Sequence, residues 1–179
     1  TFMFYTIKDD DKETTYPSGG DRICNRDFAD YIQTQIVEDI RQTMVPDWQK
    51  RHLMHQSMSE TRNPKVPSTI IELLSHHNYY DMTFGLDPKF KFIASRAIYK
   101  GMLRFIHQTT GTPYVVQPLP VQQMNISYAN NDSLHIRWAE RVDRLEPTAT
   151  PSYYILYTRT SQLRNGEWQT SDWDNGIRV

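Results

Sequence analysis

The stretch "VPSTIIELLSHHNYYD", residues 66–81, decides the fold prediction. Pro67 favours extended backbone at its start, and the following "STIIELL" surrounds a single acid, Glu72, with apolar residues. Such a short apolar run is typical of a strand in a parallel sheet that is covered on both faces. We therefore expect Glu72 to lie at the end of a buried strand.

An amphipathic helix is expected before this strand. Apolar residues recur every four positions from Phe28 through Ile32 and Ile36 to Ile40. This spacing predicts a helix of about four turns, with Asn25 as its N-cap and the apolar stripe facing the core.

A second helix is expected after the strand, over residues 87–108, where Asp87 and Pro88 suit the N-cap and first helical positions. Together with "TFMFYTI", residues 1–7, as a further strand, the order of elements predicts an α/β fold with a mixed or parallel sheet and flanking helices. The core face of the second helix should comprise Phe90, Ile93, Ala94, Ala97, Ile98, Met102 and Phe105.

The pattern changes near residue 115. Apolar and polar positions alternate in "MNISY" and again in "LHIRW", which predicts antiparallel strands joined by a turn at "ANND", residues 129–132. We therefore expect two domains, an α/β domain over residues 1–114 and an all-β domain over residues 115–179.

Composition excludes several classes of function. The 20 basic and 21 acidic side chains give a net charge of −1, which offers no general attraction to nucleic acid or to an anionic membrane surface. No apolar run approaches the roughly 20 residues of a membrane-spanning helix, so no membrane span is expected. Cys24 is the only cysteine, and no glycine-rich phosphate-binding loop occurs.

Glu72 allows two kinds of explanation. A salt bridge to an arginine or a helix-capping contact would account for it structurally. Alternatively, catalytic groups of open α/β sheets gather at the carboxyl ends of strands, where a glutamate can act as a general acid or base.

The segment around Glu72 resembles the zinc-dependent N-acetylmuramoyl-L-alanine amidases of the amidase-3 type. Pro67 leads the strand, Asn78 and Asp81 follow the glutamate at the family's spacing, and "LDPKFKFIASRAIYKGMLRFI" is similar to the closing helix. The resemblance covers roughly residues 1–107. One departure is that Leu74 and Ser75 stand where the family has Gly-Phe.

The resemblance implies roles for individual residues. Glu72 would be the general base that activates a zinc-bound water, and Ser75, His76 and Asn78 would contact the substrate. The family's zinc ligands correspond to positions upstream of Thr1, so no metal ligand is expected within this chain. The isolated chain is therefore expected to be inactive, and an intact parent protein would carry the zinc.

The histidine pair His76 and His77 is a weak candidate for metal binding. Adjacent residues on an extended segment point to opposite sides, so such a pair rarely binds one metal ion. One of the two rings could instead line a substrate groove.

The β segment resembles part of a fibronectin type III domain, an immunoglobulin-like sandwich. Trp138 would take the place of the core tryptophan, and Tyr154 or Tyr157 would cross it from the next strand. Because such a sandwich needs about 90–100 residues, it is expected to be incomplete. Multidomain proteins that join these two parts are sometimes catalogued as xanthan lyases, although nothing in the sequence supports a lyase mechanism.

Two functions of different class follow. The first is a fragment of a periplasmic or cell-surface hydrolase that cleaves the N-acetylmuramoyl-L-alanine amide of peptidoglycan. The second is a non-catalytic module of a multidomain surface protein that binds peptidoglycan or another cell-surface glycan, or acts as a scaffold. The altered loop after Glu72 favours the second modestly.

Overall fold

The computed structural model describes residues 1–130 and 133–179. The chain divides into two compact units, Thr1–Val115 and Val116–Val179. Two residues of the expected "ANND" turn, Asn131 and Asp132, lie outside the described residues.

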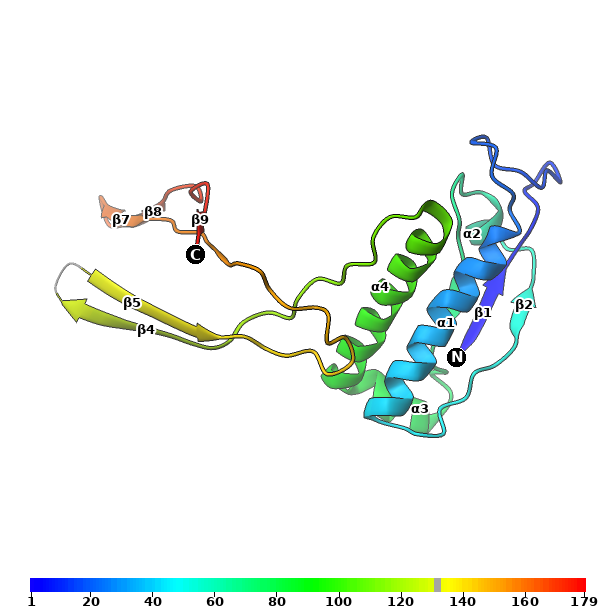
Figure 1. Ribbon diagram of the computed structural model, residues 1–179, viewed down its shortest axis with the longest axis horizontal. Helices are drawn as coiled ribbons and strands as arrows, with labels where there is room; N and C mark the ends of the chain where they lie inside the picture. The colour runs from blue at the N-terminus through cyan, green and yellow to red at the C-terminus, as the bar shows by residue number, and fades with distance from the viewer. Residues whose placement is uncertain (131–132) are drawn as a thin grey trace. The chain divides into compact units, whose positions relative to one another are not determined.

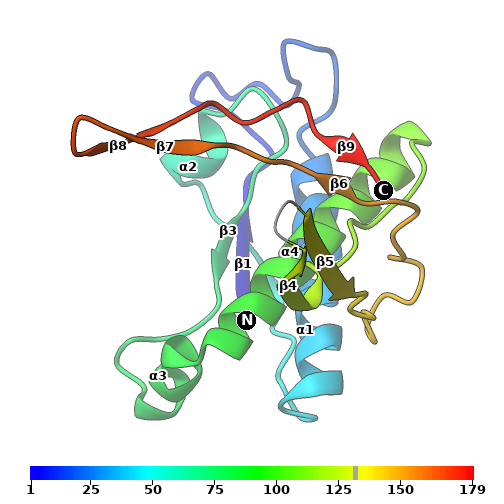
Figure 2. The ribbon, with the colours of Figure 1, turned by 90° about the vertical axis from the view of Figure 1, so that its left-hand side faces the viewer.

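The first unit contains a three-stranded mixed sheet in the order β2-β1-β3, with β2 beside β1 in Figure 1 and β3 beside β1 in Figure 2. The central strand β1 (Phe2–Tyr5) runs parallel to β2 (Leu53–His55) and antiparallel to β3 (Ile70–Glu72). The parallel pair follows from the long helical crossover between its strands. The expectation of a parallel strand at Glu72 is wrong, because the connection from β2 to β3 contains only a one-turn helix and re-enters the sheet in the opposite direction.

Helix α1 (Cys24–Thr43) covers one face of this sheet, and a second long helix packs against α1. This second helix, α4 (Pro88–Thr110), packs along α1, with β1 behind α1 (Figure 1). As the sequence predicted, Asp87 caps α4 by accepting a hydrogen bond from the backbone N–H of Lys89 at 2.8 Å. Gly111 ends the helix in the left-handed conformation, at φ 71°.

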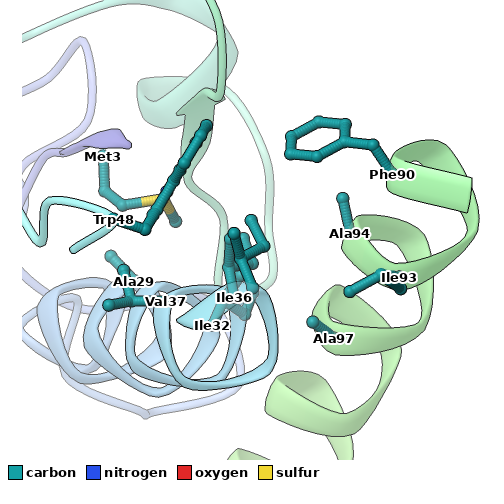
Figure 3. Packing of buried hydrophobic residues seen from close by; sticks show 11 residues of the cluster. Met3, Ala29, Ile32, Ile36, Val37, Trp48, Phe90, Ile93, Ala94 and Ala97 are labelled. Atoms are coloured by element: carbon teal, nitrogen blue, oxygen red, sulfur yellow. The ribbon is translucent and has the colours of Figure 1, made fainter. Parts of the chain in front are cut away.

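The core lies between α1, α4 and the sheet. Figure 3 shows the side chains of the two helices pointing toward one another, with Met3 of β1 and Trp48 beside them. The predicted apolar stripe of α1 is confirmed, because Ile32, Ile36 and Ile40 are almost completely buried. On α4, the buried apolar residues are Phe90, Ile93, Ala94, Ala97 and Phe105.

The contact between α1 and α4 holds two features that the apolar pattern did not predict. Lys100 is fully buried and forms an ion pair with Asp39, Nζ to Oδ2, at 2.7 Å. Gly101 lets the helices approach closely, since a Cβ at this position would lie 2.6 Å from the Cα of Ile32. Met102 was expected in the core, but it is 40% exposed. Lys100 and Gly101, rather than Met102, occupy the side of α4 that faces α1.

Asn25 is not the N-cap of α1. The helix begins one residue earlier, and the side chain of Asn25 is buried inside the first turn. Its amide donates to the carbonyl of Thr6 at 2.7 Å, while its oxygen accepts from the Tyr16 hydroxyl at 2.6 Å and the Ser68 N–H at 2.9 Å. These bonds satisfy backbone groups that would otherwise be buried without partners.

Two short helices complete the first unit. Helix α2 (Ser59–Arg62) lies in the connection between β2 and β3, and α3 (Tyr79–Leu86) follows β3. No residue of α3 is buried, and its N-cap is Asn78.

The second unit consists of antiparallel strand pairs. Three two-stranded sheets are formed by the described residues, β4 with β5, β6 with β9, and β7 with β8. The expected antiparallel β structure is therefore confirmed, but the strand that was expected to carry Tyr154 or Tyr157 is reduced to the two residues of β6. The strands are β4 (Gln122–Asn130), β5 (Ser133–Ala139), β6 (Ile155–Leu156), β7 (Ser161–Arg164), β8 (Glu167–Thr170) and β9 (Ile177–Arg178).

Aromatic residues of the second unit divide into two groups. Trp138 of β5 contacts Tyr154 edge to face, with ring centroids 5.3 Å apart, and both residues are partly buried. Trp168 and Trp173 are instead largely exposed. Across the described residues of both units, no helix is long and apolar enough to cross a membrane.

Candidate functional site

A groove of about 530 Å³ opens at one end of the sheet in the first unit. Its walls come from the start of β1, the segment that follows α1, the end of β3 and the loop that leads to α3. These parts are far apart in the sequence, and the sheet brings them together because β1 lies between β2 and β3. Three of the four site residues expected from the sequence, Glu72, Ser75 and Asn78, line this groove.

Glu72 is the last residue of β3 and is directly opposite Phe2 of β1. Its side chain is exposed, so the expectation of a buried strand end is wrong. The reason is that β3 is an edge strand among the described residues, and the groove, rather than a helix, adjoins its end.

Neither structural explanation for Glu72 applies within the described part of the chain. The carboxylate makes no ion pair and no hydrogen bond there, and it caps no helix. An acid that is held at the wall of a groove without a protein partner is available to a ligand or to a water molecule.

Asn78 and Asp81 shape the loop beside Glu72. The Asn78 side-chain oxygen accepts from the backbone N–H of Tyr80 at 2.9 Å and of Asp81 at 3.3 Å, which caps α3. The Asp81 carboxylate in turn accepts from the N–H of Ser75 at 2.8 Å. Both side chains therefore hold the loop. Ser75 also lines the groove, and within the described residues its hydroxyl forms no hydrogen bond of this kind.

His76 does not belong to the groove lining. The rings of His76 and His77 lie against each other with centroids 3.8 Å apart, and both residues are exposed. The expected contact between His76 and the substrate has no support in the geometry, because neither His76 nor His77 lines the groove.

The sequence did not single out three residues that line the groove. Trp48 forms its apolar floor, packed against Phe84 and Phe90 with ring centroids 5.6 Å apart in each case. Tyr80 stands at the groove with 61% of its surface exposed. Arg51 supplies a guanidinium group. Trp48 and Tyr80 could have been noticed in the sequence as aromatic residues next to turn residues. Nothing in the sequence marked Arg51 as a site residue.

The groove is acidic overall. Three carboxylates, from Asp47, Glu72 and Asp81, line it together with one cationic side chain, that of Arg51. Its apolar lining comes from Phe2, Val45, Trp48, Leu73 and Leu74. A mixture of apolar walls and a few charged groups is typical of sites that bind small organic molecules.

Metal binding and thiol chemistry find little basis in the described residues. No group of three or more His, Cys, Asp or Glu side chains among them is arranged to hold a metal ion. Burial raises the pKa of the Cys24 thiol, which keeps it protonated and poorly nucleophilic near neutral pH.

Comparisons with known proteins add no assignment, since no family model, no curated protein and no solved structure matches this chain.

Proposed function

We propose that this chain is part of a hydrolase that cleaves the N-acetylmuramoyl-L-alanine amide of peptidoglycan, with Glu72 as the general base. The observation that carries the proposal is an unpaired carboxylate at the wall of a 530 Å³ groove, beside Ser75 and Asn78. The resemblance of roughly residues 1–107 to the amidase-3 type supplies the reaction. Because peptidoglycan lies outside the cytoplasmic membrane, the proposal also assigns the protein to the periplasm or the cell surface.

The proposed mechanism uses only side chains of this chain. Glu72 would accept a proton from the water that attacks the amide carbonyl, for which the water must approach within about 2.6–3.2 Å of a carboxylate oxygen. A groove of 530 Å³ falls within the range of about 300–1,000 Å³ found for organic ligands. Its apolar walls would exclude bulk water from the scissile bond.

The zinc ion is implied by the family resemblance and not by the residues that the structure describes. In the amidase-3 type the metal polarises the scissile carbonyl. The described residues do not fit a zinc site, since no three suitable side chains come together among them. We therefore assign no zinc ligand and no metal-dependent step to this chain.

A non-catalytic glycan-binding or scaffolding module is the second candidate. The observation that favours it is the exposed ring of Tyr80 at the groove, held edge to face against Phe84 at 5.1 Å. A fixed aromatic ring with a free face suits the apolar face of a sugar. In this candidate the second unit would be a spacer of fibronectin type III-like character, with Trp168 and Trp173 as further exposed rings.

The test compares Glu72→Gln with wild type in the natural full-length polypeptide that contains this sequence. Release of new peptide amino groups from purified muropeptides is the readout. Loss of a general base should lower the rate by about 10²–10⁴-fold. Glu60→Gln is the matched control, because Glu60 is an exposed acid on α2 that does not line the groove.

The outcomes separate the two candidates. Equal hydrolysis by wild type and Glu72→Gln would remove Glu72 from the mechanism. Absence of hydrolysis in the wild type, together with co-sedimentation with peptidoglycan that is lost in Tyr80→Ala, would establish the binding module instead. The isolated 179-residue chain is expected to show no hydrolysis.

A further inference from the structure

Arg51 holds a special position in the groove. It lies two residues before Leu53 of β2, whose Cα partner on β1 is Met3, so it stands at the same end of the sheet as Glu72. Its guanidinium carbon is 5.3 Å from the ring centroid of Phe2. Phe2 is in turn the cross-strand partner of Glu72. Residues directly opposite in an antiparallel pair have Cβ atoms about 4.5–5.5 Å apart and point to the same face.

The donors of Arg51 are free for a ligand. Its backbone carbonyl accepts from the Gln33 side chain at 2.9 Å, which fixes the segment. Its side chain rests on Phe2 and, within the described residues, forms no ion pair with a carboxylate. A guanidinium group offers five N–H donors in a planar fork that matches a carboxylate.

Charge decides where an anionic group of a ligand can bind in this groove. Asp47, Glu72 and Asp81 would each repel it, and Arg51 is the one cationic side chain among the lining residues. A ligand carboxylate would therefore pair with the Arg51 guanidinium, at the same end of the sheet as Glu72.

We infer that Arg51 is the anion-binding position of the groove and that it selects muropeptides with a free carboxylate on the stem peptide close to the scissile amide. The inference rests on the proposed function, since it names the group of the peptidoglycan substrate, a stem-peptide carboxylate, that Arg51 would bind. Bare glycan strands lack both the scissile amide and the stem peptide with its carboxylates, so the groove would prefer peptide-bearing sugars.

The experiment measures binding of two ligands that differ in one group. The first is the γ-amide of N-acetylmuramoyl-L-alanyl-D-glutamate, whose α-carboxylate is free, and the second is the corresponding α,γ-diamide, whose glutamate has no free carboxylate. Calorimetry in the natural full-length polypeptide, with Glu72→Gln to prevent turnover, should show about tenfold tighter binding of the carboxylate form, as expected for one charge-assisted hydrogen-bonded pair.

Arg51→Gln should abolish this preference. Lys50→Gln is the matched control, because it removes a neighbouring charge whose exposed pair with Asp30 lies outside the groove lining. A preference that persists in Arg51→Gln, or is lost equally in Lys50→Gln, would overturn the inference. The inference would also be overturned if the Glu72→Gln protein that retains Arg51 showed no preference for the carboxylate form.

Failure of the inference and failure of the proposed function give different results. Hydrolysis by wild type without carboxylate discrimination would leave the hydrolase standing and remove the role of Arg51. Discrimination that depends on Arg51 without any hydrolysis would leave the anion site standing in a binding module. Binding of neither ligand, without hydrolysis, would overturn both.

Discussion

Asn25 joins three separate segments of the first unit through one buried amide. Its replacement by alanine would leave the Thr6 carbonyl, the Ser68 N–H and the Tyr16 hydroxyl without their partner. Since buried unsatisfied polar groups are costly, we expect Asn25→Ala to lower the free energy of unfolding by about 2–4 kcal/mol. Urea denaturation followed by circular dichroism would measure the change.

Asn63→Ala provides the comparison, because Asn63 is exposed at the end of α2. Its effect should stay within about 0.5 kcal/mol. Equal midpoints for the two variants would show that the buried network of Asn25 makes no net contribution.

Residues differ in how far the sequence reveals them. Glu72 could be singled out because an acid within an apolar run is unusual, and Asn78 was named from its spacing after Glu72 in the family resemblance. Asn25 was recognised as a polar residue near a helix start, but its partners lie 9 to 43 positions away, so its buried role needed the fold. Arg51 could not be found, because only the alignment of β1 with its neighbours places it beside Glu72.

The close contact of α1 with α4 depends on Gly101. Alanine at this position would place its Cβ 2.6 Å from the Ile32 Cα and 3.1 Å from the Tyr31 carbonyl oxygen, both backbone atoms that cannot rotate away. The helices must then separate. We expect Gly101→Ala to lower the free energy of unfolding by about 1–3 kcal/mol, despite alanine's better helix propensity.

Gly85→Ala in α3 is the matched helix substitution. The nearest atom to its added Cβ is the Leu74 Cδ1 at 3.3 Å, the end of a flexible side chain. The change should be near neutral or slightly stabilising by thermal denaturation. If Gly101→Ala were equally neutral, the tight approach of the two helices would be refuted.

A pH-sensitive contact holds the loop of the second unit before β9. Asp174 accepts from the Thr158 hydroxyl at 2.6 Å and from the Gly176 N–H at 2.9 Å. The Thr158 hydrogen bonds lower the pKa of Asp174 below its ordinary value of 3.8. A lowered folded pKa means that the contact stabilises the loop above the unfolded pKa and is lost as the pH falls through the folded pKa.

We expect the amide NMR signals of Thr158 and Gly176 to move together as the pH is lowered through this range below 3.8. Asp174→Asn should remove that titration, because it has no proton to gain there. An unchanged titration in Asp174→Asn would assign the transition to another group.

Elements were predicted well where periodicity determines them. The apolar stripes located α1 and α4, and Asp87 with Pro88 gave the start of α4. Strand direction could not be read from the apolar run around Glu72, since alternation and composition do not encode orientation. The buried pair of Lys100 and Asp39 had a partial signal, because each lies three positions from a core residue on its own helix, Ala97 and Ile36.

At the scale of the whole molecule, the two units differ in how much apolar surface they bury. The first unit has a core between two long helices and a sheet, whereas large apolar side chains of β4 and β5 remain more than half exposed, including Met124, Ile126, Tyr128 and Leu134. Two-stranded sheets of this kind are marginally stable in water. Local stability should therefore be unequal along the chain.

Hydrogen exchange would measure that inequality. We expect amides of α1 and α4 to exchange only through global opening of the first unit, and amides of β4 and β5 to exchange at least a hundredfold faster, since about 2.8 kcal/mol of local stability corresponds to that factor. Helix α3 serves as an internal reference, because none of its residues is buried and it should also exchange quickly despite being helical. Comparable protection in β4, β5 and α1 would mean that the apolar face of the hairpin is covered in solution, in which case the second unit is as cooperative a folding unit as the first.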